Sequence, residues 1–321
     1  MNTISVIVDA MERQGEGNLA VRLVAADQAN LPPFEAGAHI DLHLPNGLIR
    51  PYSLAGSPSD TSHYLLCIKQ ADDSRGGSKY IHQQLRVGQA VSISAPRNLF
   101  QLLPAPAYIL IAGGIGITPL LSMAETITAK QQPFSLFYYT QKADQIAFKK
   151  YLSNSHFSKN IVFCQSENGQ SPRHWQPEAL KQWDGQSRLY LCGPIGMMTN
   201  FKSIALSSGW PESHIHFEAF AATKPAIENQ KQERFTVEIA STGKTYEIPP
   251  ERSIASVLLE AGEPIALSCE MGMCGACLTK VLSGTPDHQD SVQTDDDKNQ
   301  AQPLMALCCS RSHSTHLRLD L

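Results

Sequence analysis

The sequence lacks an apolar run long enough to cross a membrane, and it has few charged residues. No stretch of its 321 residues approaches the roughly 20 consecutive apolar residues of a membrane-spanning helix. The first residues, Met1 to Val6, have strand character and not the basic, then apolar layout of a signal peptide. The net charge of −4 argues against nucleic acid as a main partner. We therefore expect a cytoplasmic protein that binds neither membrane nor nucleic acid.

Cysteine is sparse over most of the chain and concentrated near its end. Only Cys67, Cys164 and Cys192 lie before residue 269, and the other five of the eight cysteines fall between 269 and 309. Cysteines that form disulfides are normally spread in pairs along a chain. The grouping therefore argues against a disulfide framework, and in a reducing compartment it favours metal or cluster binding.

The grouped cysteines have the spacing of a plant-type [2Fe–2S] ferredoxin. Cys269 and Cys274 are separated by four residues, Cys274 and Cys277 by two, and a fourth candidate follows at Cys308 or Cys309. Soft thiolate sulfur is the ligand that such clusters take. The alternative is a four-cysteine zinc site, but structural zinc usually takes two close cysteine pairs and only one is present. The motif predicts a carrier of single electrons.

The rest of the chain divides into segments with different patterns. Residues 1–104 carry short strand-like runs separated by turns such as Asn46-Gly47, which predicts an antiparallel barrel or sandwich. Residues 105–224 alternate apolar strands with helices, the signature of a parallel α/β sheet. Residues 225–234 are polar and predict a linker, and 235–321 contain a hairpin, a helix and the cysteine loop. The expected fold class is therefore multidomain, part all-β and part α/β.

One motif in the first segment has side chains suited to a flavin. Arg50 and Tyr52 stand two apart on an expected strand and so share one face, with Ser53 on the other. The guanidinium suits a phosphate and the ring suits the isoalloxazine. The same residues are also ordinary in an exposed strand.

A second motif in that segment precedes a short expected helix. Gly76, Gly77 and Ser78 would expose backbone N–H groups where the helix dipole favours an anion, and Ser78 can serve as N-cap and phosphate donor. The alternative is a plain capped turn.

The second segment carries three further candidates. Gly114 and Gly116 lie between an apolar strand and a helix, where glycines allow a pyrophosphate to approach the backbone, although the standard Rossmann pattern is matched imperfectly. Cys192 ends a later strand, at the edge where α/β sheets present ligands. Glu218 and Phe220 end the last strand, and Phe220 can stack on a flavin ring or fill an interdomain core.

Together these motifs resemble the phthalate dioxygenase reductase family. Arg-x-Tyr-Ser, a glycine pair with serine, Gly-Gly-x-Gly-x-Thr-Pro, Cys-Gly-Pro and Glu-x-Phe precede a plant-type cluster motif in the family's own order. The glycine pair departs from the family pattern because no residue separates it from Ser78. The resemblance covers essentially the whole chain. It implies an antiparallel flavin-binding β-barrel, an α/β nicotinamide-nucleotide domain with a parallel sheet, and a C-terminal β-grasp [2Fe–2S] domain.

The resemblance also assigns site residues. It places flavin and nicotinamide contacts at Arg50, Tyr52, Ser53, Gly76, Gly77, Ser78, Gly114, Gly116, Thr118, Cys192, Glu218 and Phe220. Thr118, Cys192 and Phe220 are expected nearest the chemistry. The implied cluster ligands are Cys269, Cys274, Cys277 and Cys308, because the family's fourth ligand precedes a Val-Ser-Arg or Cys-Ser-Arg segment, here 309–311.

The implied activity is NADH-dependent electron transfer. Electrons would pass through FMN, or FAD, and the [2Fe–2S] cluster to the terminal Rieske component of an oxygenase or demethylase, with a vanillate-type system as the leading expectation. Many relatives carry Arg where Gln141 stands, and its absence favours NADH over NADPH. The alternatives are a free-standing reductase of ferric chelates, quinones or small oxidants, and a redox-sensing or zinc-stabilised binding module. The family also implies a monomer.

Charge is distributed unevenly along the chain. Residues 233–321 contain 13 acidic and 7 basic residues, a net charge of −6, which leaves +2 for the remainder. An acidic cluster segment would steer toward a basic patch on its acceptor protein. We expect the three aspartates at 295–297 to form a solvated loop, not a metal site.

Overall fold

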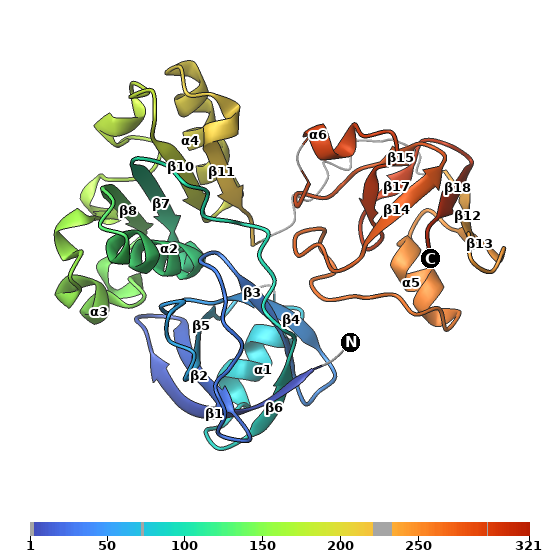
Figure 1. Ribbon diagram of the computed structural model, residues 1–321, viewed down its shortest axis with the longest axis horizontal. Helices are drawn as coiled ribbons and strands as arrows, with labels where there is room; N and C mark the ends of the chain where they lie inside the picture. Colours follow the sequence, from blue (N-terminus) through green and yellow to red (C-terminus); the bar gives the residue numbers. More distant parts are fainter. Residues whose placement is uncertain (1–2, 72–73, 221–232, 294) are drawn as a thin grey trace. The chain divides into compact units, whose positions relative to one another are not determined.

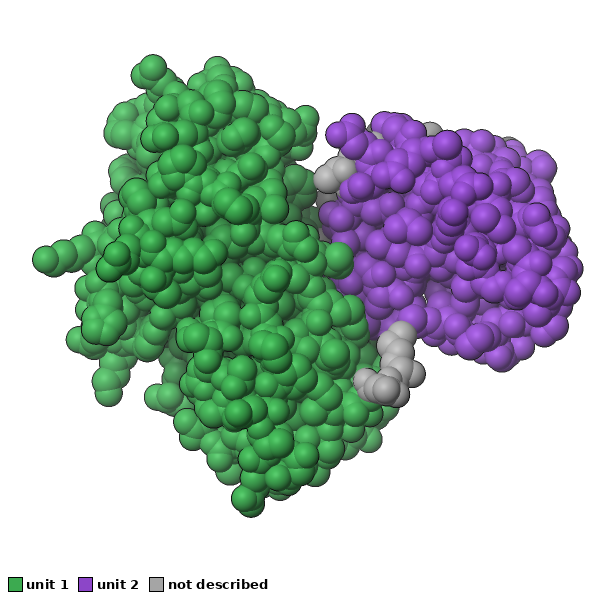
Figure 2. All heavy atoms as spheres, viewed as in Figure 1, with its two compact units in different colours: residues 1–220 green, residues 221–321 purple. Residues whose placement is uncertain are grey.

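Three β-sheets of five or six strands follow one another along the described part of the chain in the computed structural model (Figure 1), and two short strands near its end pair as a fourth sheet. The structure describes residues 3–71, 74–220, 233–293 and 295–321. The first two sheets belong to one compact unit, Met1–Phe220, and the third to another, Ala221–Leu321, coloured green and purple in Figure 2. The expected linker, 225–234, lies outside the described residues except for its last two positions. Within the described ranges, no helix is long and apolar enough to cross a membrane.

The first sheet is an antiparallel, barrel-like layer of six strands in the order β4-β3-β6-β1-β2-β5. Alternation along the strands sends Val6, Val8, Val21 and Leu23 into one core, where Ile81 of helix α1 joins them. This confirms the predicted antiparallel flavin-domain architecture. The elements are β1 (Ile4–Arg13), β2 (Asn18–Ala25), β3 (His39–His43), β4 (Ile49–Ser53), β5 (Tyr64–Lys69), α1 (Gly77–Gln83) and β6 (Ala90–Ile93).

The second sheet is parallel, with five strands in the order β11-β10-β7-β8-β9. The apolar run at its centre forms a strand in which every residue is buried, as the sequence predicted. The elements are β7 (Tyr108–Gly113), α2 (Ile117–Ala129), β8 (Phe134–Thr140), α3 (Lys149–Asn154), β9 (Ile161–Gln165), β10 (Arg188–Cys192), α4 (Ile195–Ser207) and β11 (Ile215–Glu218). A short 3-10 turn, η1 (Gly114–Gly116), joins β7 to α2.

Different helices cover the two faces of this parallel sheet. Leu110 and Cys192 belong to the core that contains α2, whereas Ile111 and Leu191 belong to the core that contains α4. Successive side chains on a strand point to opposite faces, so the alternation follows from the strand geometry. As a result, the side chain of Cys192, the last residue of β10, points toward α2, the helix that follows the glycine-rich loop.

The third sheet has the order β13-β12-β18-β14-β16, with β12 and β18 parallel and the other pairs antiparallel. This is the expected β-grasp architecture. The Ser253 hydroxyl caps helix α5 by accepting a hydrogen bond from the backbone N–H of Ser256. The elements are β12 (Phe235–Ile239), β13 (Thr245–Ile248), α5 (Ile254–Glu260), β14 (Leu278–Ser283), β15 (Pro286–Asp287), α6 (Asp295–Lys298), β16 (Leu304–Ala306), β17 (Arg311–Ser312) and β18 (His316–Leu319).

The three aspartates at 295–297 do not form the loop that we expected. They make up the first three residues of the short helix α6, which ends at Lys298. Lys298 lies in the last turn, where a basic residue interacts favourably with the C-terminal end of the helix dipole, as acidic residues such as Asp296 do near the N-terminal end. This charge order accounts for a helical turn in so polar a stretch.

Candidate functional site

Three candidate residues meet where the first and second sheets come together. Cys192 and Glu218 are register partners at the carboxyl ends of β10 and β11, and the Glu218 carboxyl interacts with the side chain of Ser53 at the end of β4. Burial raises the pKa of Glu218 to about 8, and the Ser53 side chain opposes that rise. Its Oε2 atom is buried and, among the described residues, has no hydrogen-bond partner. An unpartnered buried carboxyl oxygen fits a site that a ligand completes.

Arg50 brings the two flavin-type motifs into contact. Its Nη1 donates to the Ile49 carbonyl at 2.7 Å and its Nη2 donates to the Arg75 carbonyl at 3.2 Å. A Cβ at Gly77 would lie only 2.7 Å from the Arg50 Cγ, so glycine is required for this approach. Tyr52 lies in the same strand, where burial raises its pKa above the ordinary value and the Arg50 charge opposes the rise. The guanidinium therefore lies along the start of α1, where a phosphate is expected.

Ser78 does not cap helix α1, which corrects the expectation from sequence. The N-cap is Gly76, in the left-handed conformation with φ 93°, and no side chain caps the helix. The Ser78 hydroxyl instead donates to the Ser74 hydroxyl at 2.9 Å and accepts from the Ala71 backbone N–H at 3.2 Å. Ser78 is the second residue of the helix, two positions past the N-cap, and its hydroxyl holds the preceding loop.

The glycine-rich loop interlocks with the strand end that carries Cys192. A Cβ on Gly116 would lie 2.1 Å from the Cys192 carbonyl oxygen, which no real side chain tolerates. Gly114 has φ 55° and open space where a Cβ would stand. Thr118 is buried and its hydroxyl donates to the Ile115 carbonyl at 3.1 Å. Gly116 thus serves packing, whereas Gly114 leaves the open space that a dinucleotide would need.

Cys192 and Phe220 differ in exposure. Cys192 is fully buried, and both burial and the neighbouring Glu218 carboxyl raise the pKa of its thiol. Phe220 is half-exposed and packs against the same core cluster as Cys192. The structure therefore gathers Ser53, Cys192, Glu218 and Phe220 in one region of the first unit.

The cysteine loop in the second unit directs backbone donors at sulfur. The N–H groups of Met271 and Met273 lie 3.3 and 3.4 Å from the Cys269 Sγ, and the Gly272 N–H lies 3.2 Å from the Cys308 Sγ. The neighbouring thiols of Cys274 and Cys308 lower the pKa of Cys269, and these N–H groups contribute to the same shift. Such donors stabilise thiolates that bind iron.

The two adjacent cysteines behave differently. Cys308 interacts with the thiols of Cys269 and Cys277, and that interaction with Cys308 lowers the pKa of Cys277. The Cys309 Sγ lies 3.8 Å from the Ala306 carbonyl oxygen and 3.9 Å from the Ser310 hydroxyl. Among described residues no three His, Cys, Asp or Glu side chains are grouped to hold one metal ion. A [2Fe–2S] cluster instead distributes four thiolates over two irons, which the donor set at this loop fits.

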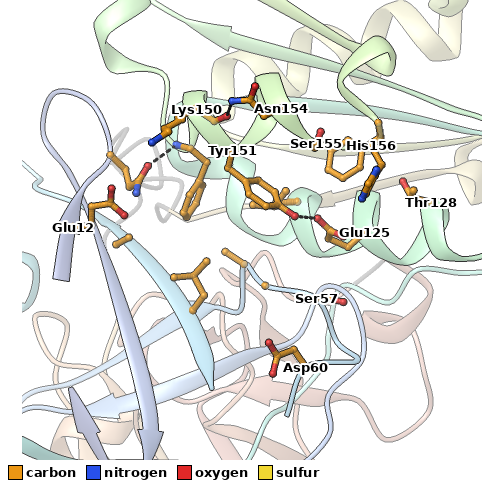
Figure 3. Close-up of a pocket in the computed structure, with 18 of the residues that line it drawn as sticks. Glu12, Ser57, Asp60, Glu125, Thr128, Lys150, Tyr151, Asn154, Ser155 and His156 are labelled. Carbon is orange, nitrogen blue, oxygen red and sulfur yellow. Dashed lines mark hydrogen bonds between the residues drawn. The ribbon is translucent and has the colours of Figure 1, made fainter. Parts of the chain in front are cut away.

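A separate cavity of about 790 Å³ lies in the first unit (Figure 3). Ser57 and Asp60 of the first segment line it opposite Glu125 and Tyr151 of the second, and the Tyr151 hydroxyl donates to the Glu125 carboxylate. Its lining includes none of the residues predicted to contact flavin or nicotinamide, all of which lie in the described ranges. The cavity is therefore distinct from the site around Ser53 and Glu218.

Sequence reasoning missed Met197, which packs between two loops of the candidate site. Its Cε and Sδ atoms would lie 2.7 Å from a Cβ on Gly113, and its Cε equally close to one on Gly193. Met197 lies in α4 with no distinguishing pattern, so only the arrangement of the two glycines in space reveals its place. It holds the glycine-rich loop against the loop that follows Cys192.

Comparisons with known proteins agree with this geometry. A family model described as "2Fe-2S iron-sulfur cluster binding domain" matches residues 237–313, and one described as "Oxidoreductase NAD-binding domain" matches residues 110–203. The chain is 41% identical to a vanillate O-demethylase oxidoreductase of Pseudomonas sp. (strain HR199 / DSM 7063), over 99% of this chain and 100% of that protein. It is 36% identical to a phthalate dioxygenase reductase of Burkholderia cepacia, over 91% and 89% of the two chains.

A solved structure extends the likeness to three dimensions. The structure of phthalate dioxygenase reductase, described as modular for electron transfer from pyridine nucleotides to [2Fe–2S], matches with a TM-score of 0.75 and 33% identity. The match covers 100% of this chain and 98% of that one. With the motifs in the family's order and relatives that match along nearly their whole length, the chain belongs to the phthalate dioxygenase reductase family.

Proposed function

We propose that this chain is the reductase component of a two-component Rieske oxygenase system. It is an NADH-dependent oxidoreductase with a flavin, FMN, and a [2Fe–2S] cluster. The observation that carries the proposal is that one chain contains both the buried Ser53–Glu218 contact, which we propose as part of a nicotinamide–flavin site, and a cysteine loop with N–H groups aimed at sulfur. Bound flavin would accept a two-electron hydride and release electrons singly to the cluster.

The first unit would bind and orient the flavin and NADH, between which two electrons pass as a hydride. Arg50 and the N–H groups at Gly77 and Ser78 would hold the flavin phosphate, because the guanidinium already lies along that turn. Tyr52 and Ser53 would contact the ring. Further contacts are proposed for Gly76, Gly114, Gly116, Thr118, Cys192, Glu218 and Phe220.

Glu218 has the protonation state that such a site would use. With a pKa of about 8, the carboxyl is largely protonated at neutral pH and can donate a hydrogen bond toward a reacting group. The buried Cys192 thiol, with its raised pKa, would stay neutral beside it and exclude water. Phe220 would cover the flavin ring when NADH is not bound.

The second unit would hold the cluster that passes single electrons to the acceptor protein. We assign Cys269, Cys274, Cys277 and Cys308 as ligands, with Cys309 outside the set. The support is that Cys308 interacts with the thiols of Cys269 and Cys277 and accepts the Gly272 N–H, whereas the Cys309 Sγ lies near the Ala306 carbonyl, the Ser310 hydroxyl and the Cys308 thiol. We further propose domains 1–104, 105–224 and 235–321, a monomer, and a cytoplasmic setting in which cysteines stay reduced and available to bind a cluster.

The proposed acceptor is the terminal oxygenase of a vanillate-type demethylase, since a relative of that name is among the most similar. The net charge of −6 over residues 233–321 would attract a basic patch on that protein. Raising salt from about 0.05 to 0.5 M should slow electron transfer to the oxygenase but leave NADH oxidation with a small dye nearly unchanged. Equal salt sensitivity of both rates would contradict charge-guided docking.

The direct test supplies this chain and NADH to purified candidate oxygenases. We expect demethylation of vanillate by a vanillate-type oxygenase, and no product when this chain is omitted. An oxygenase that acts on another aromatic acid serves as the comparison. Faster reduction of ferric chelates or quinones than of every oxygenase would favour a free-standing reductase instead.

A further inference from the structure

A segment outside the cysteine motif contacts the cluster loop at one residue. The backbone N–H of Ser291 donates to the Gly272 carbonyl at 3.0 Å, and Gly272 itself donates its N–H to the Cys308 sulfur at 3.2 Å. Both hydrogen-bonding groups of a single residue are therefore used, one toward sulfur and the other toward the 290–293 turn. A movement of the 290–293 turn would therefore move the Gly272 N–H that donates to the Cys308 sulfur.

Gly272 has no room to shift against the turn. It has φ 70°, and a Cβ built on it would lie 3.0 Å from the Asp290 Cα and 2.5 Å from the Cys309 Sγ. The left-handed backbone and this contact together require glycine. The cysteine loop at Gly272 therefore packs between the Asp290 backbone and the segment that carries Cys308 and Cys309.

Asp290 closes the turn with its side chain. One carboxylate oxygen accepts the Gln293 backbone N–H at 3.0 Å and the other accepts the Gln293 Nε2 at 3.1 Å. The Lys298 ammonium donates to the Asp290 carbonyl at 2.9 Å, and the side chain is fully buried. A buried carboxylate with two directed hydrogen bonds fixes the backbone that carries it.

We propose that Asp290 is a positioning residue for the iron–sulfur cluster. By closing the 290–293 turn, it holds the Ser291 N–H on Gly272, and so holds the Gly272 N–H on the Cys308 sulfur. A donor to a ligand sulfur stabilises the extra negative charge of the reduced cluster and restrains the loop against loss of iron. The inference rests on the proposed function, because it requires the cluster to be bound at this loop.

The test compares Asp290→Ala with Asp290→Asn in the full-length, cofactor-loaded protein. Both changes remove the charge equally. Asparagine keeps an acceptor for the Gln293 backbone, and its amide can donate to the Gln293 Oε1, which is buried and unpartnered within the described chain. Any difference between the two variants therefore reports the closed turn and not the charge. Asp320→Ala, which alters an exposed aspartate, is the matched control.

We expect Asp290→Ala to lose its cluster to a chelator roughly tenfold faster than wild type. Asp290→Asn and Asp320→Ala should lose the cluster at a rate within about twofold of wild type, because the hydrogen bonds around the ligand sulfurs are kept. Asp290→Ala should also have a lower cluster midpoint potential than Asp290→Asn and altered electron paramagnetic resonance g-values. Reduction of the flavin by NADH should be the same in all variants.

Indistinguishable potentials and cluster lifetimes in Asp290→Ala and Asp290→Asn would overturn the inference. If circular dichroism shows Asp290→Ala unfolded, Gln293→Ala replaces it. That change removes only the Nε2 bond, and we expect a smaller shift in the same direction; no shift overturns the inference. A wild-type protein without iron–sulfur absorbance would overturn the proposed function as well, whereas the equal-variant result overturns this inference alone.

Discussion

The Ser53 side chain at the end of β4 interacts with the Glu218 carboxyl at the end of β11 and lowers the pKa of that carboxyl. This interaction is one of several polar contacts between the two parts of the first unit; Asn18, for example, donates to the Gln145 carbonyl at 3.2 Å. Burial keeps the carboxyl protonated near neutral pH, with a pKa of about 8, and the interaction with Ser53 offsets part of that effect. The protonation of Glu218 is therefore a measurable property of the site.

Glu218→Gln should change how stability depends on pH. The folded pKa of about 8 lies above the ordinary glutamate value of 4.5, so between these values the folded chain holds a proton that the unfolded chain releases. The stability that this proton provides is complete below pH 4.5 and is lost as pH rises toward about 8. The slope is at most about 1.4 kcal/mol per pH unit.

Urea unfolding followed by tryptophan fluorescence measures this difference. The stability of wild type relative to Glu218→Gln should fall between about pH 5 and 8. Glu178→Gln, at an exposed glutamate, should show no such trend. A pH-independent difference between wild type and Glu218→Gln would contradict the raised pKa.

Gly116→Ala should damage the nicotinamide site while leaving the second unit intact. The new Cβ would stand 2.1 Å from the Cys192 carbonyl, so the loop or the strand end must move. Overpacking of this kind costs about 1–3 kcal/mol. We expect lower thermal stability of the first unit and at least tenfold slower flavin reduction by NADH, measured by stopped-flow absorbance.

Gly196→Ala provides the matched control for that change. Gly196 lies exposed in α4 with open space around its Cβ position. Alanine favours a helix by roughly 0.5–1 kcal/mol over glycine. The control should be neutral or slightly stabilising, and equal damage from both substitutions would show that contact with Cys192 is not the cause.

Gln141→Arg should raise the use of NADPH. Gln141 is exposed directly after β8, at the edge of the parallel sheet where nucleotide ribose is expected. A guanidinium there can pair with a 2′-phosphate, which glutamine cannot do. We expect kcat/KM for NADPH to rise by roughly tenfold, as one charge-assisted pair provides. Gln141→Lys is a graded comparison, and no gain with Arg would place the ribose elsewhere.

Cys308→Ser and Cys309→Ser should have opposite consequences. Cys308 interacts with Cys269 and Cys277 and accepts the Gly272 N–H, so its loss should prevent stable cluster assembly. The Cys309 Sγ lies near the Ala306 carbonyl, the Ser310 hydroxyl and the Cys308 thiol, and we place it outside the ligand set, so its serine variant should retain the cluster. Iron and sulfide content of the purified variants checks the assignment. Loss of iron from Cys309→Ser alone would reverse it.

Much of the fold could be predicted because local pattern and tertiary burial agree. The apolar run beginning at Tyr108 became a strand buried on both faces, and alternating runs formed the barrel-like sheet. The short strands after the cysteine loop were missed. β15 and β17 have two residues each and are held by pairing with each other, so they leave no periodic signal.

The site was predictable only to the level of motifs. Sequence spacing identified the cysteines and the glycine-rich loop, but it could not show that Gly116 packs on Cys192. It misplaced the cap of α1, because Gly76 and Ser78 both suit helix starts and they stand only two positions apart. No sequence pattern marked Asp290. Its side chain closes the 290–293 turn, and that turn contacts the cysteine loop through Ser291 and Gly272, which are far from each other in sequence.

The central claim is that one chain passes electrons from NADH through flavin to iron and sulfur. An anaerobic titration of the purified, cofactor-loaded protein with NADH, followed by absorbance and electron paramagnetic resonance, tests it most directly. We predict that the flavin bands bleach, that the broad brown absorbance of the cluster falls, and that a reduced [2Fe–2S] signal appears. A protein whose flavin bleaches while the iron–sulfur signal never appears, or one that is colourless and contains zinc, would contradict the account.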